Sequence, residues 1–174
     1  MTKNDRPAFG FEVLQQDGAA RRGRVTSGFG VVDTPAFMPV GTAASVKAMM
    51  PEQVASTGAQ IILSNTYHLM LRPGPERVER LGGVRKLMGW DGPLLTDSGG
   101  FQVMSLGPLR NISEQGVSFK SHLDGSIFDL TPERSTQIQH MLDATITMAF
   151  DECTPFPATY DEARASMELS LIHI

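Results

Sequence analysis

The sequence contains a single cysteine, Cys153, among its 174 residues. One thiol excludes an internal disulfide framework, and it also excludes a metal site built from several cysteines. Long apolar runs are missing as well, since no stretch approaches the roughly 20 residues that a membrane-spanning helix needs. Residues 1–7 are polar and lack the apolar core of a signal peptide. These absences predict a cytoplasmic protein with a reduced interior and no membrane partner.

Neither sign of charge dominates the chain. Fifteen lysines and arginines oppose 19 aspartates and glutamates, which gives a formal net charge of -4. This balance argues against a dominant nucleic-acid-binding surface within these residues. Because 41% of the residues are hydrophobic, the chain can bury the core of one domain.

Short apolar runs alternate with helical patterns through most of the chain. The runs are typical of strands buried on both faces, because turn-forming residues bound them and they lack clean alternation. They lie at 61–65, 93–96 and 146–150. Helical patterns lie at 45–50, 51–57, 75–81, 84–88, 131–142 and 160–171. Alternation of this kind predicts a parallel sheet covered by helices, and both a flavodoxin-like open sheet and a (β/α)8 barrel fit.

Two segments depart from this alternation. The first forty residues indicate a β-rich segment, with strands at 9–14 and 22–26 around a turn at 16–18. Farther along, Asp124-Gly125 between two alternating runs predicts an inserted β-hairpin. We therefore predict one α/β domain over residues 1–174, with the β-rich segment at about 9–40 and βα units over about 41–170.

A carboxylate ends two of the predicted strands. Asp97 follows the run at 93–96 and precedes a pair of glycines, and Asp151 follows the run at 146–150. Because the carboxyl ends of parallel strands meet at one edge of a sheet, we expect both acids to face one site. Structural alternatives stay open. Asp97 or Ser98 would also suit the cap of a following helix, and Asp151 would suit an ion-pair cluster.

Paired carboxylates at such an edge suit three kinds of chemistry. Metal binding is the least supported, because no histidine lies near either aspartate in the sequence. Chemistry at a sugar carbon through an oxocarbenium-like state needs two carboxylates. Recognition of guanine is the third, since a carboxylate's two oxygens match its ring N–H and amino group. A phosphate cradle is disfavoured because no P-loop lysine follows the glycines.

Three further side chains stand beside these strand ends. Asn65 and His68 follow the strand at 61–65, and Cys153 follows Asp151 by two residues. Two of them have a structural interpretation as well as a functional one: His68 as a packed or hydrogen-bonded residue, and Cys153 as a buried apolar thiol.

Several long motifs, all in one register, resemble those of the bacterial tRNA-guanine transglycosylases. The resemblance runs in order from about Phe9 to Ser170. The motifs are Pro-Val-Gly-Thr at 39–42, Ser-Asn-Thr-Tyr-His-Leu-Met-Leu-Arg-Pro-Gly at 64–74, Thr-Asp-Ser-Gly-Gly-Phe-Gln-Val-Met-Ser at 96–105, Phe-Lys-Ser-His-Leu-Asp-Gly at 119–125 and Phe-Asp-Glu-Cys-Thr-Pro at 150–155.

The resemblance implies a TIM barrel that replaces guanine at the wobble position of certain tRNAs by 7-aminomethyl-7-deazaguanine, on the route to queuosine. The target nucleotide has to leave its stack to reach such a pocket. By resemblance, Asp97 is the general acid/base and Asp151 reads the purine edge. The same family pattern places Phe101 against the base, Ser98, Gly99 and Gly100 along the pocket, Cys153 beside Asp151, and Asn65 and His68 as supports.

The sequence also departs from the family. The nucleophilic aspartate of a later strand has no counterpart here, and neither has the Cys-x-Cys-x-x-Cys plus His site for Zn2+. The resemblance therefore implies the N-terminal portion of an incomplete (β/α)8 barrel that binds no zinc, with an atypical tail at 171–174. At full length it implies a homodimer that binds tRNA and the 7-deazaguanine base. A non-catalytic base- or tRNA-binding relative, an inactive fragment, and a two-carboxylate barrel enzyme such as a glycosidase remain as alternatives.

Overall fold

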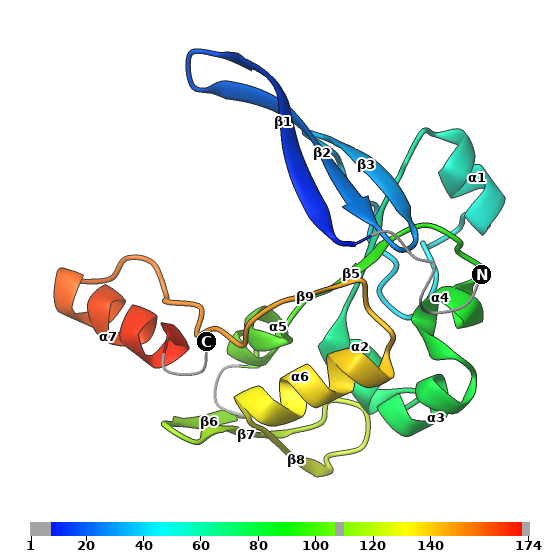
Figure 1. The fold of residues 1–174 in the computed structure, drawn as a ribbon. Coiled ribbons are helices and arrows are strands. Elements are labelled where there is room, and N and C mark those ends of the chain that lie inside the picture. The colour runs from blue at the N-terminus through cyan, green and yellow to red at the C-terminus, as the bar shows by residue number, and fades with distance from the viewer. Residues whose placement is uncertain (1–7, 107–109, 172–174) are drawn as a thin grey trace.

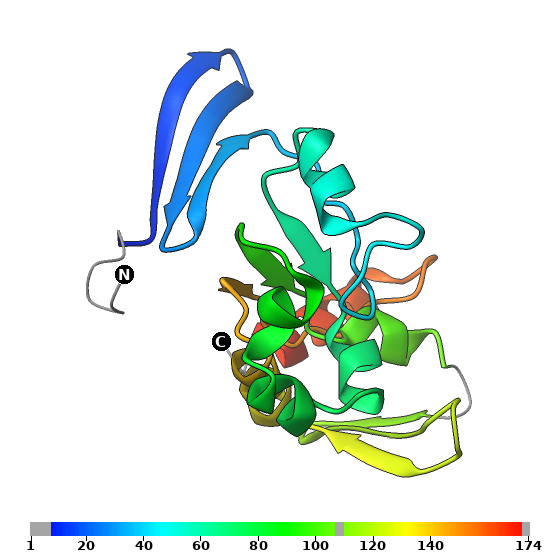
Figure 2. The same ribbon diagram turned by 90° about the vertical axis from the view of Figure 1, so that its right-hand side faces the viewer.

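The computed structural model describes residues 8–106 and 110–171. Within them the chain is a mixed α/β structure with three sheets of three strands each. Two antiparallel sheets lie at opposite ends of the molecule, and the parallel strands with their helices lie between them (Figures 1 and 2). The tail predicted at 171–174 lies outside the described residues beyond Leu171.

The N-terminal sheet is antiparallel, as the β-rich pattern predicts. It contains β1 (Gly10–Asp17), β2 (Ala20–Ser27) and β3 (Gly30–Thr34) in chain order. Its first turn lies at residues 18–19 instead of the predicted 16–18, because Gly18 takes the positive φ of 56° that the tight turn requires.

The central sheet is parallel, which confirms the prediction from the alternating pattern. It contains β4 (Ile62–Ser64), β5 (Leu94–Thr96) and β9 (Ile146–Thr147) in the order β4-β5-β9. Val40 adds an isolated parallel bridge to Leu63 on the other side of β4. Four successive segments therefore lie side by side in chain order. No closed barrel is seen in the described part of the chain.

Short helices follow the strands. They are α1 (Pro51–Ser56), α2 (Thr66–Leu71), α3 (Pro75–Arg80), α4 (Gly83–Met88), α5 (Gly100–Met104), α6 (Pro132–Met141) and α7 (Tyr160–Leu171). The predicted helix at 45–50 is wrong. Met50 is extended because it precedes Pro51, and Ala44 and Ala48 have positive φ angles that interrupt a helix. Helix α2 was not predicted. None of the described helices is long and apolar enough to cross a membrane.

The predicted hairpin forms and belongs to a larger sheet. Strands β7 (Gly116–Lys120) and β8 (Ile127–Leu130) pair around a six-residue turn, and β6 (Arg110–Ser113) adds a third strand. The helix that follows begins as the sequence predicts. The Thr131 hydroxyl accepts a hydrogen bond from the Arg134 N–H at 3.1 Å, and Pro132 occupies the first turn.

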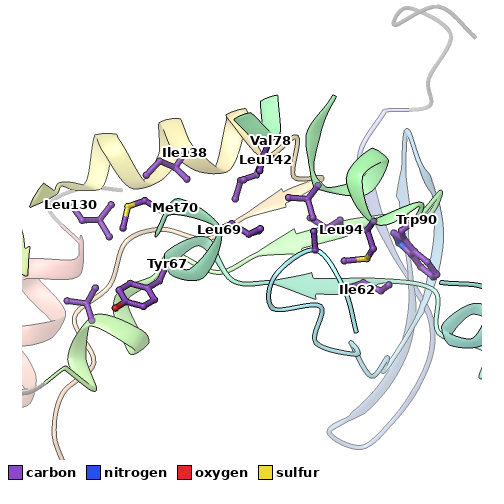
Figure 3. Packing of buried hydrophobic residues seen from close by; sticks show 14 of the residues in the cluster. Ile62, Tyr67, Leu69, Met70, Val78, Trp90, Leu94, Leu130, Ile138 and Leu142 are labelled. Carbon is purple, nitrogen blue, oxygen red and sulfur yellow. The ribbon is translucent and has the colours of Figure 1, made fainter. Parts of the chain in front are cut away.

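The core lies where α2, α3, α4 and α6 cover the parallel strands (Figure 3). Ile138 of α6, Leu142 directly after α6 and Leu69 of α2 belong to one buried cluster with Ile62 and Leu94 of the strands, and all five are fully buried. Burying such a side chain contributes about 1.5–3 kcal/mol. This packing fixes α6 against the carboxyl ends of β5 and β9.

Candidate active site

The two predicted acids leave neighbouring parallel strands at the same edge of the sheet. Asp97 follows β5 directly, and Asp151 lies four residues beyond the end of β9. The predicted strand at 146–150 is thus shorter than expected, because its ladder to β5 ends at Thr147. The extra residues carry Asp151 outward, and its side chain is exposed whereas that of Asp97 is half-buried.

Three donors hold the carboxylate of Asp97. The Asn65 amide donates to Oδ2 at 2.5 Å, the Thr66 N–H donates to Oδ1 at 2.8 Å, and the Gln102 amide donates to Oδ2 at 3.0 Å. The donors come from the exit of β4, the start of α2 and the first turn of α5. Asn65 contacts Asp97 directly, in keeping with the supporting role that the resemblance implies. Gln102 and Thr66 were not predicted, although both stand in the quoted motifs.

Ser98 joins the two strand exits. Its hydroxyl donates to Oδ1 of Asp151 at 2.9 Å and accepts the N–H of Gly100 at 3.2 Å. The N-cap of α5 is Gly99, so Ser98 stands one residue before the cap and accepts the N–H of the first helical residue, Gly100. Asp97 accepts a backbone N–H from the start of α2, and from α5, the helix that follows it, the side-chain amide of Gln102.

The two glycines allow a close crossing of chains. Gly99 has a φ of 88°, in the left-handed region. A Cβ atom on Gly100 would lie 2.4 Å from the carbonyl oxygen of Asp151 and 3.1 Å from its Oδ1. Only glycine fits there without displacing Asp151. The Gly99-Gly100 pair thus sets the spacing between the β5 and β9 exits.

A small recess with a cavity volume of about 50 Å³, open at its mouth, lies beside Asp151. Asp151, Glu152, Cys153 and Ser170 are its polar lining residues. Glycines and apolar side chains from α5, β6, β7 and α7, with Pro132 and Phe150, line the rest. The Cys153 thiol lies 3.7 Å from Oδ2 of Asp151 and is half-buried. Asp97 and Phe101 do not line this recess, and the Phe101 side chain is 62% exposed.

Helix α2 carries an aromatic cluster next to Asp97. The buried Tyr67 hydroxyl and Nδ1 of His122 are 2.8 Å apart, and their rings stack with centroids 5.8 Å apart. His122, in the turn between β7 and β8, is exposed but attached to α2 by this contact. Burial raises the pKa of Tyr67. Burial also lowers the pKa of His68, with His122 adding to the effect and Asp97 opposing it.

Helix α6 contributes two buried polar residues that were not predicted, Ser135 and Gln139. The Ser135 hydroxyl donates to the carbonyl oxygen of Ser98 at 2.7 Å. A signal was present in the sequence, since these residues lie four apart and share a helix face with apolar Ile138 and Leu142. Polar residues on an apolar face indicate specific buried partners.

A zinc site of the cysteine-rich kind does not fit this chain. The sequence holds one cysteine, and the described residues contain no group of three or more histidine, cysteine, aspartate or glutamate side chains placed to hold a metal ion.

Comparison with known proteins identifies the family. The model of the family "Queuine tRNA-ribosyltransferase" matches residues 16–173. The queuine tRNA-ribosyltransferase of Rickettsia felis is 63% identical over 162 residues, covering 93% of this chain and 45% of the relative. That of Zymomonas mobilis is 62% identical over 169 residues, covering 97% of this chain and 44% of the relative. That of Rickettsia bellii is 62% identical over 162 residues, covering 93% of this chain and 45% of the relative.

The chain thus spans a little under half the length of the curated relatives that it matches. With the family model matching most of its residues, the chain belongs to the queuine tRNA-ribosyltransferase family.

Proposed function

We propose that this chain supplies the acid/base and base-reading half of a tRNA-guanine transglycosylase. The full protein exchanges guanine at the tRNA wobble position for 7-aminomethyl-7-deazaguanine. One observation carries the proposal: Asp97 and Asp151 leave adjacent parallel strands and are joined through Ser98, whose hydroxyl donates to Asp151 at 2.9 Å. The proposed substrates, guanine in tRNA and the incoming 7-deazaguanine base, follow from the family membership.

Asp97 manages the protons of the exchange. When guanine leaves the ribose it takes up a proton, and the incoming base gives one up before it bonds to the sugar. A carboxylate held by donors from three elements, Asn65, Thr66 and Gln102, is oriented before the base arrives. Such orientation is what general acid/base transfer requires.

Asp151 reads the base. Its Oδ2 faces the recess side with Cys153, while Ser98 holds Oδ1. A carboxylate accepts two parallel N–H donors, which is the pattern of guanine's ring N–H and amino group. Phe101 is sufficiently exposed to stack on a base that enters from solvent.

The remaining parts of the enzyme lie in the portion of the relatives that this chain does not cover. By resemblance these are the covalent nucleophile, the zinc site and the basic loops for tRNA. The order Val40, β4, β5, β9 supports the proposal that these segments are the first four strands of a (β/α)8 barrel. Homodimerisation at full length is proposed on the same resemblance.

A chimera tests the proposal. It joins residues 1–170 of this chain to the C-terminal portion of the Zymomonas mobilis relative, to which the chain is 62% identical over 169 residues. We expect the chimera to incorporate radiolabelled guanine into tRNA. We expect Asp97→Asn to lower turnover about a hundredfold or more, because the amide cannot take up a proton. Asp151→Ala should chiefly raise the KM for the base. A folded chimera without exchange, or near-normal turnover by Asp97→Asn, would contradict the proposal.

The main alternative is a relative that binds base or tRNA without reacting. Asp97 with its complete set of donors argues against it, since a binding protein has no need of an oriented proton carrier. Guanine binding by the chimera without exchange would favour this alternative. Hydrolysis of a simple glycoside would instead favour a glycosidase.

A further inference from the structure

Gln139 of α6 lies under both strand exits of the proposed site. Its side chain is fully buried. Its Oε1 accepts the Thr96 hydroxyl at 3.0 Å and the Met148 N–H at 2.8 Å. Its Nε2 donates to the Met148 carbonyl at 2.9 Å and to the Ser135 hydroxyl at 3.3 Å. Two acceptor positions and two donor hydrogens are all used, so the amide is saturated.

The amide binds the backbone just past the end of the β5–β9 ladder. The ladder ends at Thr147, and Met148 is the first residue beyond it. Gln139 takes both the N–H and the carbonyl of Met148, which is what a neighbouring strand would do. The chain thus stays fixed past the end of the ladder, three residues before Asp151.

The same amide also contacts β5 one residue before Asp97. Thr96, itself buried, donates its hydroxyl to the oxygen that accepts the Met148 N–H. Ser135, one helical turn earlier, bonds to Ser98. One face of α6 is therefore hydrogen-bonded to both strand exits.

We propose that Gln139 is a positioning residue for base recognition, and that it acts through Met148 and Thr96 to set the place of Asp151 relative to Asp97. This inference rests on the proposed function. Asp97 has three donors that do not involve Gln139, whereas the segment leading to Asp151 is bonded to Gln139 through both backbone groups of Met148. Loss of the amide should therefore disturb base binding more than proton transfer.

The test uses the chimera and Gln139→Leu, which keeps the volume and removes all four hydrogen bonds. At temperatures well below unfolding, we expect the KM for guanine to rise about tenfold or more, because misplacing a binding group by up to about an ångström weakens its contribution by up to about a hundredfold. We expect kcat at saturating guanine to stay within about threefold of the unsubstituted value. A merely structural residue would lower the unfolding temperature and leave the KM of the folded enzyme unchanged. The matched control is Gln137→Leu on the exposed face of α6, which should change neither constant.

A milder variant covers the case in which Gln139→Leu does not fold. Thr96→Val removes a single bond to the amide, and we expect about a threefold rise in the KM for guanine. An unchanged KM in whichever of these variants folds overturns the inference. Failure of the unsubstituted chimera to exchange guanine contradicts the proposed function instead, so the two failures are distinguishable.

Discussion

At the scale of single residues, three neutral polar side chains orient the two acids of the site. Asn65 and Gln102 orient the carboxylate of Asp97, and Ser98 orients that of Asp151. Asparagine and glutamine amides donate without carrying charge, so they orient an acid without neutralising it. The neutral donors therefore orient both acids and leave their charge in place.

A pH prediction belongs at this scale. The pKa of His68 is lowered from 6.5, first by burial and then by His122. The folded protein then binds fewer protons than the unfolded chain as pH falls below 6.5, so stability present above that pH is progressively lost. We expect His68→Gln to reduce the fall in unfolding temperature between pH 7.5 and pH 5.5, measured by calorimetry. An identical pH dependence in both proteins would contradict this.

At the scale of elements, the turn from β5 into α5 crosses the chain after β9 at very short range. The left-handed Gly99 turns the chain, and Gly100 passes the backbone of Asp151. Two loops that carry acids can approach in this way only where one of them lacks a side chain.

Gly100→Ala tests this crossing. Its Cβ atom would lie 2.4 Å from the Asp151 carbonyl oxygen, so the β9 exit must shift. We expect a loss of about 1–3 kcal/mol in the free energy of unfolding, as for other overpacked sites, measured by urea denaturation. In the chimera, the KM for guanine should also rise.

Gly10→Ala in β1 is the matched control, because nothing lies within 4 Å of its added Cβ atom. It should leave stability nearly unchanged. Equal effects of the two substitutions would show that the close approach to Asp151 has no consequence.

At the scale of the whole molecule, apolar side chains remain exposed around the parallel sheet and the N-terminal sheet. Val40, beside β4 at one edge of the parallel sheet, is 48% exposed. Met148, directly after β9 at the other edge, is also 48% exposed. Phe11 and Phe37 are 60% and 81% exposed. Exposed apolar residues and open strand edges favour association with other polypeptide.

We expect the 174-residue chain alone to incorporate no guanine into tRNA, because by resemblance the covalent nucleophile lies in the portion of the relatives that it does not cover. The chimera should incorporate guanine and should unfold at a higher temperature. The measurements are labelled-base incorporation and a thermal melt of both proteins. Incorporation by the chain alone would show that it holds a nucleophile of its own.

The sequence by itself determined the kinds of elements and the identity of the acids. Short apolar runs ending in Asp97 and Asp151 indicated parallel strands with a shared edge, because a buried strand needs apolar residues on both faces. The cap at Thr131 and the Asp124-Gly125 turn were readable because their signals are local. The helix expected at 45–50 does not form. The proline that follows it keeps Met50 extended, and Ala44 and Ala48 have positive φ angles, so the helical pattern of the sequence does not decide the structure there.

Only the tertiary structure decided how the acids are held. The bonds from Asn65 to Asp97, from Ser98 to Asp151 and from Gln139 to Met148 join residues 9 to 53 positions apart. Hydrogen bonds of this kind depend on which elements pack together, and no local pattern specifies that packing. Gln139 illustrates the difference: its helical position was visible in the sequence, whereas its partners appeared only once α6 lay across the ends of β5 and β9.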